Sequence, residues 1–186
     1  MRVLVVGGYG FIGSAIVRRL VEDGHAVVGV GRDLAAARRR MPEASWIAGD
    51  LSRDGVEAWA ARLDGIDAVV HAAGVLQDGL YDDVRAVQAR GTDALYEACE
   101  LKGVRRVVHV SAVGASLSAG MAFMATKGEA DAALSRRDLD WVILRPSVVV
   151  GRPAYGGSAL FRGLAALPVL PVVADAGPLQ IVQLDD

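Results

Sequence analysis

The chain has 186 residues, of which 53% are hydrophobic and 23% are charged, and its formal net charge is -2. This balance is typical of an ordinary globular protein, and it gives no electrostatic reason to expect nucleic acid or an anionic membrane as a partner. The single cysteine, Cys99, excludes an intrachain disulfide framework and a cysteine-cluster metal site, and we interpret it as a small buried helix residue.

The chain begins with a strand, a glycine turn and a helix. Residues 2–6 form a short β-branched run that predicts a buried strand, and a helical pattern starts at Phe11 and continues through Ile12. Between them the glycines follow the spacing Gly7-x-x-Gly10-x-x-Gly13. Glycine lets the backbone approach a pyrophosphate closely, and the helix N-terminus offers N–H groups to the anion. We therefore predict a dinucleotide site here, and we expect a side chain added at Gly13 to occupy the place of the pyrophosphate.

This motif resembles the G-x-x-G-x-x-G form of the short-chain dehydrogenase/reductase superfamily, in particular its extended and atypical branches. The resemblance implies a Rossmann-like doubly wound α/β fold that binds NAD(P)(H). The glycine turn could instead serve only the packing of helix on strand, but its position at the start of a strand–turn–helix unit favours the nucleotide site.

The second strand is predicted over 26–30 and is followed by Gly31, Arg32 and Asp33. An acidic residue at this strand end would favour NAD, whereas Arg32 can pair with a 2′-phosphate and stack on adenine. We therefore predict a preference for NADP(H), with NAD(H) as the alternative. Arg32 could also be a solvated charge, and Asp33 is expected to cap the helix over 34–40.

The third strand, over 45–48, leads to Asp50 and Leu51, which resemble the acid–hydrophobic pair beside the adenine ring in the superfamily. Asp50 could instead be a turn residue or the N-cap of a helix over 53–63. The fourth strand, over 67–71, ends in small residues that would let a cofactor lie against the backbone, and these are Ala72, Ala73 and Gly74. We interpret His71, inside the H-x-A-G turn, as a structural residue rather than a catalytic one.

A long helix over 84–102 and a fifth strand over 104–110 follow, and the strand ends at Ser111. Strands and helices that alternate with short turns predict a parallel sheet covered on both faces. The glycine turn, Arg32, Asp50, the small residues after the fourth strand and Ser111 all follow strand ends. Because an open α/β sheet binds ligands at the carboxyl ends of its strands, these five signals predict one site at one edge.

The next helix, over 119–135, contains Lys127. In the superfamily a Tyr-x-x-x-Lys pair occupies this helix, where the Lys holds the nicotinamide ribose and the Tyr transfers the proton that accompanies the hydride. Lys127 matches the pattern, but Phe123 stands where the tyrosine would be. We therefore predict Ser111 and Lys127 as the remaining candidate catalytic residues, with a surface lysine as the alternative for Lys127.

A sixth strand over 141–144 precedes an L-R-P segment that, by resemblance, passes near the nicotinamide amide through Pro146, Ser147 and Val148. We expect a helix over 160–167 in a short, truncated C-terminal substrate lobe. The expected division is a nucleotide-binding domain over 1–150 and the start of the lobe over 151–186. The chain ends where relatives continue, so it is expected to be a fragment or an unusually minimal member with an open cleft.

The resemblance is to atypical members such as NmrA-like regulators and the NAD(P)H-binding accessory subunit of respiratory complex I. It implies an oxidoreductase or epimerase that acts on a small carbonyl or sugar-nucleotide substrate, or a dinucleotide-binding sensor or assembly module without turnover. The absence of a long apolar run and of room for a signal peptide predicts no membrane span and a cytoplasmic location. The substrate and a homo-oligomeric state remain open.

Overall fold

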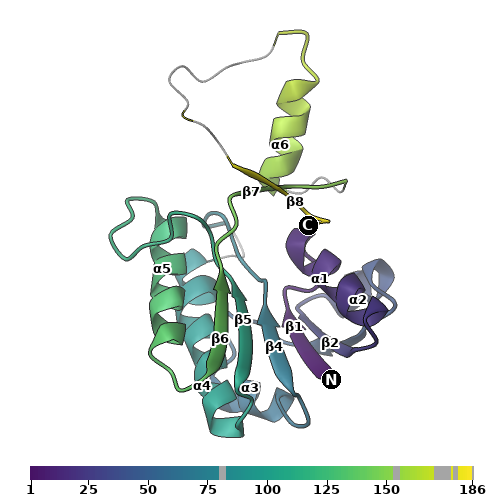
Figure 1. Ribbon diagram of the computed structural model, residues 1–186, viewed down its shortest axis with the longest axis vertical. Helices are drawn as coiled ribbons and strands as arrows, with labels where there is room; N and C mark the ends of the chain where they lie inside the picture. Colours follow the sequence, from purple (N-terminus) through teal and green to yellow (C-terminus); the bar gives the residue numbers. More distant parts are fainter. Residues whose placement is uncertain (80–82, 153–155, 170–176, 178–179, 186) are drawn as a thin grey trace.

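The structure, a computed structural model, describes residues 1–79, 83–152, 156–169, 177 and 180–185. Its centre is a six-stranded parallel sheet in the order β3-β2-β1-β4-β5-β6 (Figure 1). The strands are β1 (Arg2–Val6), β2 (Ala26–Gly31), β3 (Ser45–Ala48), β4 (Ala68–His71), β5 (Arg106–Val110) and β6 (Asp140–Leu144). The strand order reverses between β1 and β4, which confirms the predicted doubly wound α/β fold.

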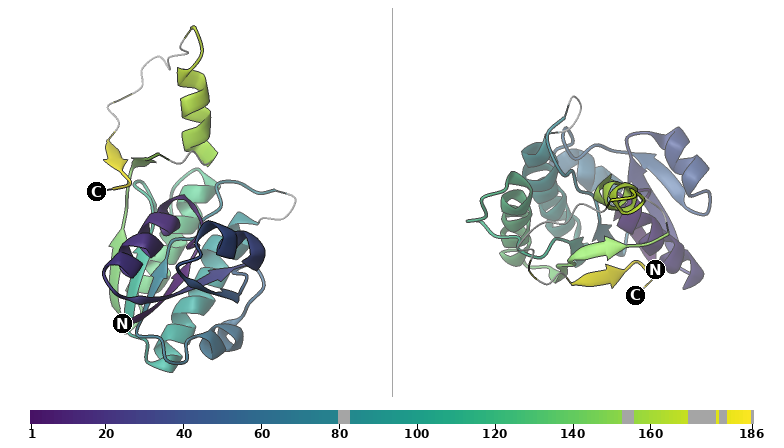
Figure 2. Two further views of the ribbon diagram at one scale, coloured as in Figure 1. Left: turned by 90° about the vertical axis from the view of Figure 1, so that its right-hand side faces the viewer. Right: turned by 90° about the horizontal axis from the view of Figure 1, so that it is seen from above.

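Helices cover both faces of this sheet (Figures 1 and 2). One face carries α1 (Phe11–Glu22) and α2 (Leu34–Arg40). The other carries α3 (Val56–Arg62), the π-helical turn η1 (Ala86–Gly91), α4 (Thr92–Lys102) and α5 (Ala122–Ser135). This arrangement follows from parallel strands, because each crossover must return over one face of the sheet.

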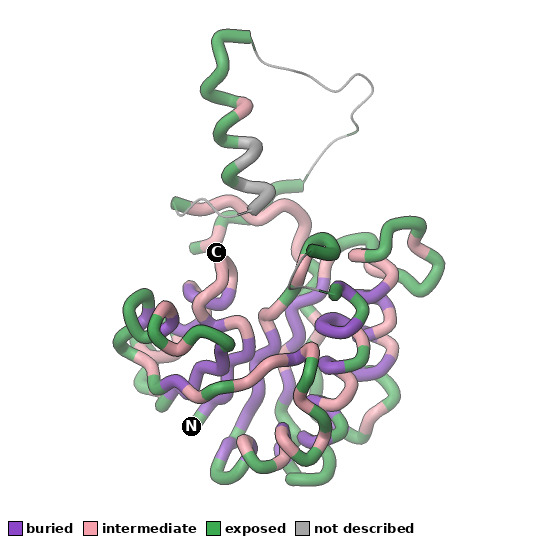
Figure 3. The backbone as a smooth tube through the Cα atoms, turned by 180° about the vertical axis from the view of Figure 1, so that it is seen from behind, coloured by how far each residue is buried: buried purple, intermediate pink, exposed green. Residues whose placement is uncertain are grey.

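The first strand shows how the sequence builds two cores. Because successive side chains of a strand point to opposite faces, Val3 and Val5 pack toward α1 and α2, whereas Leu4 and Val6 pack toward α3 and α4. All four valine and leucine side chains are buried. Figure 3 shows buried backbone in the central strands of the large sheet and in the helices that pack on them.

Three of the helices that cover the large sheet differ from the predicted ones. The helix expected over 53–63 begins at Val56, and the helix expected over 119–135 begins at Ala122. The helix expected to be continuous over 84–102 contains the π-helical turn η1. A Cβ added at Gly91 would lie 1.7 Å from the carbonyl oxygen of Leu51, so this end of η1 packs directly on backbone. Such contacts are invisible to helical periodicity.

The C-terminal part forms a separate two-stranded parallel sheet of β7 (Val148–Val150) and β8 (Ile181–Gln183). The helix expected over 160–167 is α6 (Gly156–Ala165), which stands beyond the carboxyl edge of the large sheet (Figures 1 and 2). Several residues of the expected lobe over 151–186, which are 153–155, 170–176, 178–179 and 186, lie outside the described residues. Within the described part of the chain, none of the helices is long and apolar enough to cross a membrane.

Candidate dinucleotide site

A cleft of about 500 Å³ lies at the carboxyl edge of the large sheet. Its walls come from the segments that follow β1, β2, β3, β4 and β5, and from α5. Most of the residues predicted for the site line it, and they are Gly7, Gly10, Phe11, Ile12, Arg32, Asp50, Leu51, Ala72, Ala73, Gly74, Ser111 and Lys127. The five separate sequence signals therefore meet in one cleft.

The three glycines of the turn have different surroundings. Gly7 has a φ of 82°, and a Cβ there would lie 2.6 Å from the backbone nitrogen of Ala73. A Cβ at Gly13 would lie 2.1 Å from the carbonyl oxygen of Gly7, inside the turn itself. Gly13 is buried and is not among the residues that line the cleft. The expectation that a side chain at Gly13 would enter the pyrophosphate place is therefore wrong, because that side chain would meet the protein's own backbone.

Gly10 is the N-cap of α1 and lines the cleft. In the part of the chain that the structure describes no side chain caps this helix end, and Gly10 donates its own N–H to the carbonyl oxygen of Gly7 at 3.0 Å. The first turn of a helix has N–H groups without intrahelical acceptors and a positive dipole end. This end of α1 therefore fits a phosphate group.

One end of the cleft lies beside β2, where Arg32 follows the strand and is exposed. The next residue, Asp33, caps α2 as predicted, since its side chain accepts from the backbone nitrogen of Ala36 at 2.9 Å. Asp50 is a turn residue that accepts from the backbone and hydroxyl of Ser52 at 2.9 and 2.7 Å. Although burial acts to raise it, the pKa of Asp50 is lowered by these bonds and by the charge of Arg32. The N-cap alternative for Asp50 is wrong, because α3 begins after Gly55.

The opposite end of the cleft contains Ser111, Phe123 and Lys127. The Lys127 ammonium donates to the carbonyl oxygens of Val110 at 2.8 Å and Ala73 at 3.4 Å. Burial lowers the pKa of Lys127 to about 8, against the opposing charge of Asp131. The Ser111 hydroxyl is buried and has no hydrogen-bond partner among the described residues. Phe123 lines the cleft and brings no hydroxyl to it.

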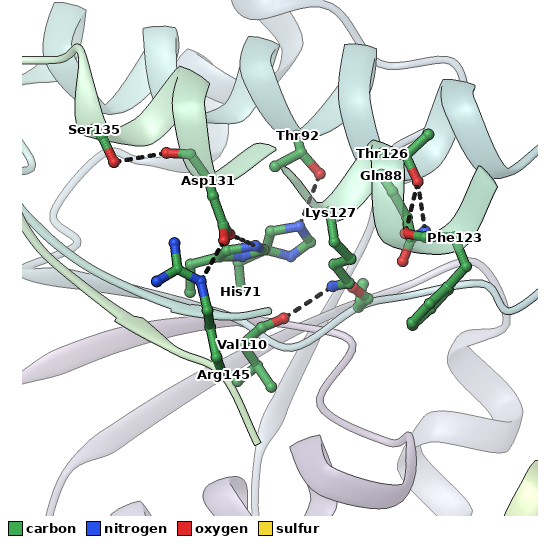
Figure 4. A network of polar contacts seen from close by, with 12 residues as sticks. His71, Gln88, Thr92, Val110, Phe123, Thr126, Lys127, Asp131, Ser135 and Arg145 are labelled. Atoms are coloured by element: carbon green, nitrogen blue, oxygen red, sulfur yellow. Dashed lines mark hydrogen bonds and ion pairs between the residues drawn. The ribbon is translucent and has the colours of Figure 1, made fainter. Parts of the chain in front are cut away.

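Gln88 is a residue of this end that the sequence analysis missed. It lies on η1, is buried, and donates its amide nitrogen to the Thr126 hydroxyl at 3.0 Å (Figure 4). Its carbonyl oxygen has no partner among the described residues. A Cβ added at Gly74 would lie 3.1 Å from that oxygen and 3.5 Å from the Lys127 ammonium. The available signal was a polar residue among the mainly apolar positions Val84, Val87 and Leu95 of the predicted helix.

Other candidates lie away from the cleft lining. Pro146 accepts from the backbone nitrogen of Val113 at 3.0 Å, and Val148 begins β7 and lines a separate cavity beside α6. Pro146, Ser147 and Val148 are not among the cleft-lining residues. His71 is buried, with Nε2 2.8 Å from the Thr92 hydroxyl, which agrees with its structural interpretation. Burial raises the pKa of Cys99 to about 12, which disfavours the thiolate a nucleophile requires.

Comparison with known proteins shows to which family the chain belongs. A family profile described as NAD(P)H-binding matches residues 7–164. Ceramide reductase from Caulobacter vibrioides is 28% identical over 185 residues, which are 99% of this chain and 57% of that protein. Photosystem II assembly factor Ycf39 from Synechocystis is 33% identical over 147 residues, which are 78% of this chain and 44% of that protein. The chain thus spans little more than half of the first relative and less than half of the second.

Solved structures give the same picture. UDP-glucose 4-epimerase from Thermus thermophilus, in complex with NAD, has a TM-score of 0.77 and 27% identity, covering 100% of this chain and 71% of that one. A putative NAD-dependent epimerase/dehydratase from Bacillus halodurans has a TM-score of 0.69 and 27% identity, covering 84% and 74%.

Proposed function

The chain belongs to the NAD(P)H-binding family, and on this premise we propose that its cleft binds NADP(H) in preference to NAD(H). The observation that supports this placement best is the cleft itself, where the uncapped end of α1 lies between Arg32 at one end and Lys127 at the other. The pyrophosphate would lie on the α1 N-terminus, since that end offers N–H donors and no side chain of the described residues caps it. Arg32 would pair with the 2′-phosphate.

The remaining contacts follow from this orientation. Asp50 and Leu51 would lie beside the adenosine, and the small residues 72–74 would let the cofactor lie against backbone. Lys127 has three ammonium donors, two of which are directed at carbonyl oxygens, so the third can hold a ribose hydroxyl. Pro146, Ser147 and Val148 remain proposed neighbours of the nicotinamide amide. The division into a nucleotide-binding domain over 1–150 and a short lobe over 151–186 is part of the same proposal.

The reaction we propose is the interconversion of a hydroxyl and a carbonyl on a small carbonyl or sugar-nucleotide substrate. Relatives named as a ceramide reductase, a 2-alkyl-3-oxoalkanoate reductase and a UDP-glucose 4-epimerase support this class. A bound nicotinamide supplies the hydride in such chemistry. Phe123 cannot supply the accompanying proton, and the loss of a positioned acid–base group typically costs about 10²–10⁴-fold in rate. Ser111, whose hydroxyl has no described partner, is the nearest remaining donor.

The test compares the wild type with Phe123→Tyr and Ser111→Ala, using NADPH and a panel of aldehydes, ketones and quinones. Thermal stabilisation by NADPH reports binding, and NADPH absorbance reports turnover. We expect binding in all three proteins, slow turnover in the wild type, and faster turnover in Phe123→Tyr. Robust turnover that Phe123→Tyr leaves unchanged would show that the proton comes from elsewhere. Absent binding in the wild type would refute the proposal as a whole.

Binding without any turnover, in the wild type and in Phe123→Tyr, would instead support a dinucleotide-binding sensor or assembly module. Phe123 in the cleft is the observation that keeps this second function in view. The cytoplasmic location and a homo-oligomeric state stay predictions, which fractionation and light scattering would check.

A further inference from the structure

Lys127 is a buried, charged side chain. Its side chain is almost completely buried, and its two described partners are neutral carbonyl oxygens. A buried ammonium is costly unless an opposite charge lies near it. The carboxylate that supports it is Asp131, which is buried one turn further along α5. The two form no direct ion pair, but their spacing of four residues on α5 places both side chains on one face of the helix, where the charge of Asp131 favours the ammonium.

Asp131 divides its two oxygens between different neighbours. Oδ2 accepts from Nε of Arg145 at 2.8 Å, and Oδ1 lies 3.5 Å from Nε2 of His109 without a hydrogen bond. The Arg145 side chain is 51% exposed, so it reaches the carboxylate from the solvent side. In Figure 4 Arg145 points to Asp131, whereas Lys127 points to the carbonyl of Val110.

Lys127, Asp131 and Arg145 form a charged cluster, and the side chains described next, which surround it, are neutral. The imidazoles of His71 and His109 are 5.1 Å apart between ring centres. Burial, together with the charges of Lys127 and Arg145, lowers the pKa of His109 to about 3. Burial and the neighbouring His109 and Lys127 hold the pKa of His71 well below its usual range. Gln88 on η1, Thr92 and Tyr96 on α4, and Thr126 on α5 complete the surroundings, and burial raises the pKa of Tyr96.

At neutral pH the cluster therefore contains two cations and one anion. We propose that Asp131 is a positioning residue that keeps Lys127 in its charged form at the cleft, and that Arg145 limits this effect by competing for the same carboxylate. The cleft would then present an ammonium, rather than a neutral amine, to the hydroxyls of the ligand. This inference rests on the proposed placement of a dinucleotide against Lys127.

The proposal makes two variants act in opposite directions. Asp131→Asn removes the negative charge and should lower the pKa of Lys127, because desolvation and the positive charge of Arg145 then oppose the ammonium, and only the carbonyl dipoles favour it. Arg145→Gln removes a competing positive charge and should raise it. An opposite charge within about 4–6 Å typically moves a pKa by about 1–3 units, and we expect shifts of about this size. A purely structural role for the pair would predict loss of stability in both variants without opposite shifts.

The chain offers an internal reference, because its sequence contains only two lysines, Lys102 and Lys127. Lys102 lies at the end of α4 and pairs with Asp64. Lysine labelled with ¹³C at Cε gives each side chain its own titration curve by NMR in the protein without ligand, and Lys127→Arg assigns the signals. We expect the Lys127 midpoint to fall in Asp131→Asn, to rise in Arg145→Gln and to be restored by Asp131→Glu, with the Lys102 signal as the reference in every variant.

The dissociation constant of NADPH, measured across the same pH range, gives a second readout. Affinity should fall as Lys127 loses its proton, at a lower pH in Asp131→Asn and at a higher pH in Arg145→Gln. Unchanged Lys127 midpoints, or shifts of both variants in one direction, would overturn the inference. Opposite midpoint shifts without any NADPH binding would leave the charge relation standing and refute the proposed function instead. If Asp131→Asn does not fold, the rise expected in Arg145→Gln still decides.

Discussion

A substitution at Gly13 tests how closely the glycine turn packs on the start of α1. A Cβ at this position would lie 2.1 Å from the carbonyl oxygen of Gly7 and 3.0 Å from Cα of Gly8, whereas real Cβ contacts stay above 3.0 Å. In Gly13→Ala the turn and helix must therefore separate by about 0.9 Å, the difference between 3.0 and 2.1 Å. The contacting atoms are backbone, so no side chain can rotate away.

Overpacking of this kind costs about 1–3 kcal/mol, and a rigid backbone contact places Gly13→Ala near 3 kcal/mol. In a domain of this size each kcal/mol lowers the melting temperature by about 2–4 °C, so we expect a fall of about 6–12 °C. Gly10→Ala should cost less than about 1 kcal/mol, since among the described residues its Cβ would meet only the Gly7 oxygen, at 3.2 Å. Gly120→Ala is the neutral control, because no described residue lies within 4 Å of its Cβ.

Thermal unfolding followed by circular dichroism, with and without NADPH, separates packing from binding. At 100 times its dissociation constant a ligand stabilises the folded state by about 2.7 kcal/mol. Gly10 lines the cleft, so Gly10→Ala should melt near the wild type and yet gain less from NADPH. A Gly13→Ala protein that melts within about 2 °C of the wild type would refute the packing argument.

Arg32→Ala should lower the ratio of NADP(H) to NAD(H) affinity by about tenfold to over a hundredfold, since a charge-assisted contact to phosphate contributes about 1.5–3 kcal/mol, and titration of both cofactors measures it. An unchanged ratio would mean that Arg32 does not contact the 2′-phosphate. Burial lowers the folded pKa of His109 to about 3, whereas the unfolded imidazole titrates near about 6.5, so the unfolded chain binds more protons and stability falls as pH drops through this window. His109→Leu should weaken that fall in acid melts, and an identical pH profile would contradict it. Asp33→Ala removes the cap on the backbone nitrogen of Ala36 and should cost about 1 kcal/mol, or about 2–4 °C, in the same melting assay. An unchanged melting temperature would show that the cap does not stabilise α2.

The sequence alone was sufficient for the architecture. The β-branched runs and helical periodicities are local signals, and their alternation requires a parallel sheet with helices on both faces. The carboxyl ends of parallel strands meet at one edge, so residues as far apart as Gly7, Arg32 and Ser111 could be assigned to one cleft from the sequence. Lys127, which lies within a helix, was assigned to the same site only by its resemblance to the Tyr-x-x-x-Lys pattern. The helix cap at Asp33 was also predictable, because it is a local contact whose partner lies only three residues away.

The contacts that distinguish one residue of the site from another are not local. The pairing of β4 with β5 sets His71 beside His109, and that register is not written in either strand. The packing of Gly13 on Gly7 and of Gly91 on Leu51 depends on how closely two backbones approach, which a glycine in the sequence permits but does not specify. The position of the Gln88 carbonyl oxygen, which has no partner among the described residues, depends on the π-helical turn η1. The pairing of Asp131 with Arg145 depends on the packing of α5 beside β6. Such distances are decided only when the whole chain packs, because each of them joins segments that are separate in the sequence.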